Sequence, residues 1–152
     1  MMRDRLDSDL KDAMRAQDKL RTSTLRLVLA AIKDRDIDAR GQGREQISEQ
    51  DILALLQKMI KQRDESAKIY DENGRDELAK VERSEIAIIE GYLPKAMGEE
   101  ELAAAIKSAI EKTGATSLRD MGKVVGELKN KYPGQIDFGQ ASKTVKDLLS
   151  GK

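Results

Sequence analysis

The chain has 152 residues, of which 39% are hydrophobic and 37% charged, and its 28 lysine and arginine residues balance 28 aspartate and glutamate residues. A net charge of zero argues against a protein that coats nucleic acid or an anionic membrane through bulk charge. The absence of cysteine excludes disulfides and thiolate metal sites, and the absence of histidine removes the commonest general base. The N-terminus is polar and no apolar run is long enough to span a bilayer, so we expect a cytoplasmic protein with no membrane partner.

Residues 1–43 predict two amphipathic helices, because apolar side chains recur there with a period near 3.6 residues. The first covers about residues 3–17. The second starts after Asp18, whose carboxylate is a good N-cap, and fades in the glycine-containing segment 39–43.

Two further helices are predicted before residue 94. The third starts at Ser48, with Asp51 in the position where a capping carboxylate belongs, and ends at Gly74. The fourth runs from about Asp76 to a stop just before Pro94, because the residue that precedes a proline is pushed out of the helical region. Its expected inward positions are Leu78, Val81, Ile86 and Ile89.

After Pro94 the same pattern restarts with three shorter helices. The first lies between Glu99 and Gly114, the second follows a cap at Ser117, and the third begins near Phe138. We therefore predict an all-α fold in two parts: an N-terminal helical subdomain of about four helices, residues 1–93, and a small three-helix subdomain, residues 94–152.

The sequence indicates no catalytic residue, no cofactor-binding residue and no metal ligand. A nucleophilic serine needs an activating base. Ser66 and Lys68 are two residues apart, which places them on different faces of a helix. The segment Gly41-Gln42-Gly43 lacks the third glycine of a phosphate-binding loop and follows a helix where a strand is required.

One charged residue falls close to an apolar stripe. Arg63 lies three residues after Ile60 and four before Ala67 on the third predicted helix. An unpaired charge in such a position is costly. We therefore expect a structural ion pair between Arg63 and either Glu82 or Glu85 of the fourth helix.

The C-terminal stretch from Gly114 onward is slightly basic, with seven bases against four acids, whereas residues 1–93 carry 18 bases and 20 acids. The ordinary interpretation is a solvated surface. The alternative is contact with phosphate groups.

Three segments resemble the YqeY-like family. They are LKDAMRAQDKLRTSTLRLVLAAI from Leu10 to Ile32, KQRDESAKIYDENGRDELAKVERSEIAIIEGYLP from Lys61 to Pro94, and SLRDMGKVVGELK from Ser117 to Lys129. The resemblance covers essentially the whole chain. It departs from the family at Gly98, where a helix-capping serine is frequent, and at Val125, where methionine is common.

The resemblance implies a relationship to the tail domain of the B subunit of glutamine-dependent aminoacyl-tRNA amidotransferase, a domain understood to contact the tRNA body. It therefore implies contact with tRNA or another structured RNA. The lysines to which we assign this contact are Lys123, Lys129, Lys131 and Lys143. With so few aromatic residues, we expect contact through phosphates and helical shape and not through base stacking.

Other functions stay open at this point. The relatives' complex is a carbon–nitrogen ligase with glutamine as amido donor, but nothing in this chain resembles its activating domain. We therefore expect no enzyme activity from the chain alone. The alternatives are a helical module that binds a protein partner, or a part of a larger ligase complex. The sequence does not indicate an oligomeric state.

Overall fold

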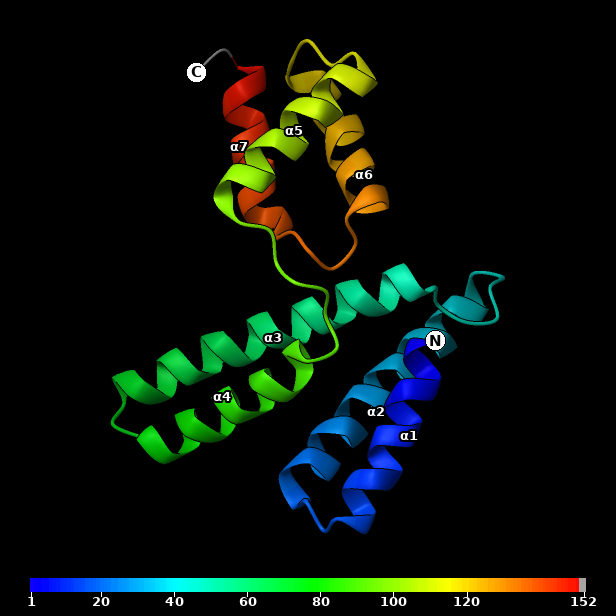
Figure 1. The fold of residues 1–152 in the computed structure, drawn as a ribbon, viewed down its shortest axis with the longest axis vertical. Helices are drawn as coiled ribbons and strands as arrows, with labels where there is room; N and C mark the ends of the chain where they lie inside the picture. The colour runs from blue at the N-terminus through cyan, green and yellow to red at the C-terminus, as the bar shows by residue number, and fades with distance from the viewer. Residues whose placement is uncertain (151–152) are drawn as a thin grey trace. The chain divides into compact units, whose positions relative to one another are not determined.

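The computed structural model describes residues 1–150, and over that range the chain is all-helical, as predicted (Figure 1). It packs as two compact units, the first from Met1 to Leu93 and the second from Pro94 onward. Lys152, one of the C-terminal bases counted above, lies outside the described residues. No helix within residues 1–150 is long and apolar enough to cross a membrane.

The first unit consists of two helical hairpins. In the first hairpin, α1 (Met2–Arg15) packs against α2 (Lys19–Gly41). In the second, α3 (Glu49–Glu72) packs against α4 (Asp76–Glu90). Figure 1 shows the members of each hairpin side by side. The hairpins meet because α2 also contacts both α3 and α4.

Three predicted helix boundaries of this unit are confirmed, those at Asp18, Ser48 and Gly74, whereas α1 ends at Arg15, before the expected residue 17. The Asp18 side chain accepts a hydrogen bond from the backbone N–H of Arg21 at 3.0 Å. Ser48 and Asp51 form a complete capping box at the start of α3. Gly74 closes that hairpin with a φ of +69°, a conformation that side chains with a Cβ rarely adopt.

The core of the first unit lies where the hairpins meet. Its largest fully buried side chains are Leu6, Leu25, Val28, Ile52, Leu56 and Ile89. Each fully buried side chain of this size contributes about 1.5–3 kcal/mol.

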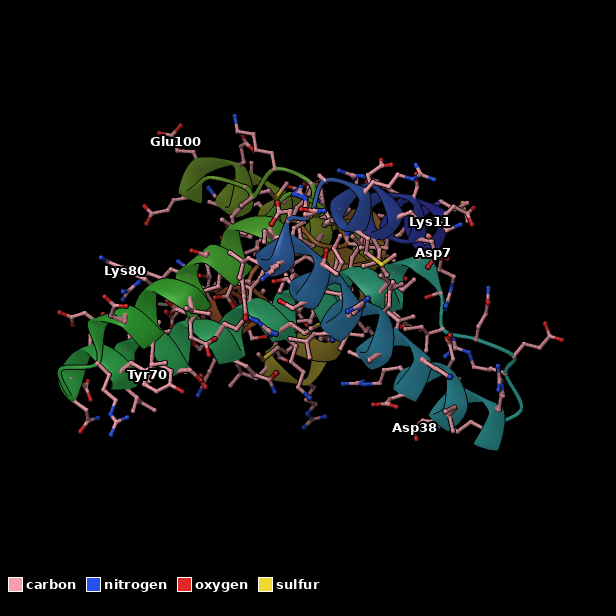
Figure 2. The ribbon with its side chains drawn as sticks, turned by 90° about the horizontal axis from the view of Figure 1, so that it is seen from below. Asp7, Lys11, Asp38, Tyr70, Lys80 and Glu100 are labelled. Atoms are coloured by element: carbon pink, nitrogen blue, oxygen red, sulfur yellow. The ribbon has the colours of Figure 1, made fainter. Side chains whose placement is uncertain are left out.

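The prediction of which α4 side chains are buried was partly wrong. Leu78 and Val81 are 42% and 47% exposed, and the buried position in this half of α4 is Ala79. Figures 1 and 2 show why: the turn end of the α3–α4 hairpin, near the labelled Tyr70, projects away from α2. Only the C-terminal half of α4, which carries Ile89, therefore reaches the core.

The second unit is a three-helix arrangement of α5 (Glu99–Thr113), α6 (Met121–Lys131) and α7 (Phe138–Leu149). A separate core holds it together, built from Ile106, Val124, Leu128, Ile136 and Val145 among others.

The prediction that Ser117 caps the second helix of this unit is wrong. A short 3-10 helix, Leu118–Asp120, precedes α6, and the Ser117 side chain makes no capping hydrogen bond. The Asp120 carboxylate instead accepts a hydrogen bond from the backbone N–H of Thr116 at 3.0 Å, which turns the chain before α6 begins. Leu118, in this 3-10 helix, is 47% exposed.

Candidate nucleic-acid interface

All four lysines assigned to RNA contact are exposed. Lys123, Lys129 and Lys131 lie on α6, and Lys143 lies on α7. Lys129 and Lys131 are two residues apart, so their side chains leave α6 about 200° apart around the helix axis. The lysines of α6 therefore do not form one continuous face.

The end of α6 combines cations with aromatic rings. The Nζ atom of Lys129 lies 5.5 Å from the centre of the Phe138 ring, and that of Lys131 lies 5.5 Å from the centre of the Tyr132 ring. Both rings are partly buried against the core of the second unit. Two of the four aromatic residues of the chain thus sit beside predicted RNA-contact lysines, a clustering that we did not predict.

Lys123 has a different environment at the start of α6. Its Nζ atom lies 3.9 Å from a carboxylate oxygen of Asp120. The backbone N–H of Thr116 holds the pKa of Asp120 below its ordinary value, so this carboxyl stays ionised at neutral pH. The local charge of Lys123 is therefore partly offset.

Arg63 forms an ion pair with Glu85, one of the two partners expected. Its Nε atom lies 2.8 Å from a carboxylate oxygen, and the two side chains are only 14% and 15% exposed. Arg63 also donates a hydrogen bond to the carbonyl of Met59 at 3.2 Å. Glu82 makes no ion pair with Arg63. Burial and the neighbouring charge of Glu85 raise the pKa of Glu82.

Sequence reasoning missed a second charged pair in the interior. Arg3 donates two hydrogen bonds to the carboxylate of Asp36, at 2.7 and 2.8 Å, and a third to the carbonyl of Ile47 at 3.1 Å. The Asp36 carboxylate also accepts from the backbone N–H of Ile47 at 2.9 Å. These contacts join α1, α2 and the segment before α3.

A third polar contact holds the end of α4 to α1. The Tyr92 hydroxyl donates to the carboxylate of Asp9, and the Arg5 guanidinium lies 4.6 Å above the Tyr92 ring. Arg5 also donates to the carbonyl of Gly91 at 3.0 Å. Burial, followed by the hydrogen bond to Asp9, raises the pKa of Tyr92 to about 12. This tyrosine therefore has a structural role and stays protonated at neutral pH.

Metal binding finds no support in the part of the chain that the structure describes. Within residues 1–150, no group of three acidic, histidine or cysteine side chains could hold an ion.

Comparison with known proteins identifies the family. The family model described as Yqey-like protein matches residues 3–149. The chain belongs to the YqeY-like family. Its relatives include proteins named "Altered inheritance of mitochondria protein 41, mitochondrial". The one from Kluyveromyces lactis is 33% identical over 141 residues, which cover 90% of this chain and 75% of the relative. The one from Pyrenophora tritici-repentis is 28% identical over 151 residues, covering 97% of this chain and 81% of the relative.

A third relative, from Lachancea thermotolerans, is 42% identical over 88 residues, but the match spans only 46% of that protein. These YqeY-family relatives correct one expectation. The expectation that this chain is cytoplasmic is contradicted, because all three relatives are named as mitochondrial proteins.

Proposed function

We propose that this YqeY-family protein is an accessory module that contacts tRNA or another structured RNA through backbone phosphates and has no enzyme activity by itself. The observation that carries the proposal is the placement of Lys129 and Lys131 at the end of α6, beside Phe138 and Tyr132. Exposed lysine ammonium groups bind nucleic acids by neutralising backbone phosphates, which needs no base stacking on the neighbouring rings.

The resemblance of the second unit to the amidotransferase tail domain supports the same proposal. In this interpretation the module resembles the tRNA-contacting part of that enzyme and lacks the part that performs the chemistry. Carbon–nitrogen ligase activity with glutamine as amido donor would then require a larger complex.

Titration of a tRNA transcript at several salt concentrations tests the proposal. If Lys129 and Lys131 each neutralise one phosphate, the logarithm of the affinity should fall by about 1.4–1.8 for each tenfold rise in salt from these contacts. The double variant Lys129→Glu and Lys131→Glu should weaken binding and flatten that slope. The double variant Lys123→Glu and Lys143→Glu tests the other two assigned lysines separately.

The matched control reverses the charge at two lysines elsewhere in the chain. Lys80 on α4 and Lys107 on α5 are exposed, and Lys80→Glu with Lys107→Glu changes the net charge by the same amount. The control should change affinity only slightly. Absence of tRNA binding at low salt, or equal losses in the control and in the Lys129/Lys131 variant, would refute the proposal.

A protein-binding function is the second candidate, and exposed apolar side chains favour it. In the second unit, Leu118 is 47% exposed and Leu148 is 39% exposed. Apolar side chains that stay exposed after folding are available for burial against a partner protein. Affinity capture with and without nuclease separates the two functions, because a partner held through RNA is released by nuclease and a directly bound protein is not.

A further inference from the structure

A groove of about 530 Å³ lies in the first unit between α2 and α3 and is bordered at one end by the segment that connects them. The α2 side consists of Arg35, Asp38 and Ala39 together with Gln42, the residue that caps the end of the helix, and Figure 2 labels Asp38 near that end. These positions have the spacing i, i+3, i+4, i+7, so they form one stripe along the helix.

The α3 side of the groove has the same spacing. It consists of Asp51, Ala54, Leu55 and Lys58. The middle of each stripe carries an alanine, Ala39 or Ala54, whose small side chain leaves space between the helices. Because the helices run in opposite directions from their connection, the outermost lining residues of the two stripes are Arg35 and Lys58.

The charges at the two ends of the groove differ in whether they are paired. Near the connection, Arg44 lies 3.0 Å from the Asp51 carboxylate, which neutralises both groups. At the other end, neither Arg35 nor Lys58 makes an ion pair with any residue that the structure describes. The one unpaired lining acid is Asp38, one turn from Arg35.

We propose that this groove binds a phosphate group, held between Arg35 and Lys58. The planar guanidinium of arginine matches a phosphate through two parallel hydrogen bonds, and the lysine ammonium adds a point charge. The two cations outweigh the single negative charge of Asp38, so the net charge of these three groups attracts an anion, and the attraction is stronger for a multiply charged phosphate than for a singly charged carboxylate. The site lies outside the second unit, so it goes beyond the RNA contact proposed above.

Nuclear magnetic resonance of the full chain titrated with inorganic pyrophosphate at low salt tests the site. The backbone amide signals of Ala39 and Ala54 should shift. Arg35→Gln with Lys58→Gln should weaken pyrophosphate binding about fivefold, because two exposed ionic contacts are lost. Asp38→Asn should strengthen it, an effect that general damage to the fold would not produce.

The matched control is Lys33→Gln with Lys61→Gln, which removes two exposed charges from the same two helices outside the groove. It should bind pyrophosphate like the wild type. Equal weakening in both double variants, equal shifts with acetate, or the absence of shifts at Ala39 and Ala54 with pyrophosphate would each overturn the proposal.

A tRNA transcript distinguishes a backbone phosphate from a free one. If tRNA shifts the groove amides and competes with pyrophosphate, the phosphate belongs to RNA. If only pyrophosphate shifts them, the ligand is a small phosphate compound. The groove proposal stands in both cases, and it stands even if the Lys129/Lys131 variant shows that the second unit does not contact RNA.

Discussion

The contact between Arg3 and Asp36 offers a direct test of what holds the first unit together. Asp36 is 9% exposed, and its carboxylate accepts three hydrogen bonds: two from Arg3 and one from the backbone N–H of Ile47. Asp36→Ala removes all three and leaves the Arg3 charge without its partner. Asp36→Asn keeps an acceptor for Ile47 but removes the negative charge.

The burial of the two side chains sets the size of the effect. Removing one member of a buried ion pair costs about 3–5 kcal/mol. The Arg3 side chain is 25% exposed and can reach water in the variant, so we expect the lower end, about 3 kcal/mol, for Asp36→Ala. Asp36→Asn should cost about 1–2 kcal/mol, because the weaker bonds of a neutral amide replace charge-assisted ones.

Urea unfolding monitored by nuclear magnetic resonance measures the stability of each unit separately, since signals from residues 1–93 and from residues 94–150 can be recorded in one sample. With a slope near 1.5 kcal/mol/M, the midpoint of the first unit should fall by about 2 M for Asp36→Ala and about 1 M for Asp36→Asn. The midpoint of the second unit should not move.

The pH dependence provides a second measurement. The hydrogen bond from Arg3 lowers the pKa of Asp36 in the folded state. Its stabilisation is therefore fully present above about pH 4, the ordinary value for aspartate, and is lost as the pH falls through the lower folded value. The difference between wild type and Asp36→Asn should shrink below pH 4. A difference that persists unchanged to pH 2, or an equal shift of both units, would refute the reasoning.

Three further predictions concern other contacts. Tyr92→Phe should lower the free energy of unfolding of the first unit by about 1 kcal/mol, because it removes the hydrogen bond to Asp9. In the wild type, an ultraviolet titration should show one tyrosine that ionises near pH 12. The stability that depends on the protonated Tyr92 should be lost as the pH rises from 10 toward that value. Gly98→Ser should stabilise the second unit by about a few tenths of a kcal/mol and so raise its thermal midpoint slightly, because the glycine at the N-cap of α5 makes no side-chain hydrogen bond. Arg63→Met should destabilise the first unit by about 3 kcal/mol, and adding Glu85→Met should recover much of that loss; a double variant as unstable as Arg63→Met in urea would contradict this account.

Local signals in the sequence were sufficient to predict most of the helices. The caps at Asp18 and Ser48 act on backbone N–H groups three residues away, so their chemistry is visible in a short stretch of sequence. Ser117 misled the same reasoning, because a short 3-10 helix follows it and the local side-chain hydrogen bond runs from the backbone N–H of Thr116 to Asp120.

Contacts between distant residues were harder to predict. Asp36 and Arg3 are 33 residues apart, and Asp36 stands among other charges on α2, where a solvated side chain is the ordinary expectation. Arg63 was predictable because its position broke an apolar stripe. The exposure of Leu78 and Val81 followed from how far α2 extends beside the α3–α4 hairpin, which the periodicity of α4 alone does not encode.

The separate cores have a consequence for how sequences of this family can diverge. Within residues 1–150, no side chain belongs to both hydrophobic clusters, so a change in volume at Leu56 must be compensated by neighbours in the first unit, and one at Val124 by neighbours in the second. Correlated substitutions among core positions should therefore fall within residues 1–93 or within residues 94–150. The two halves of the chain can then accumulate core substitutions at different rates.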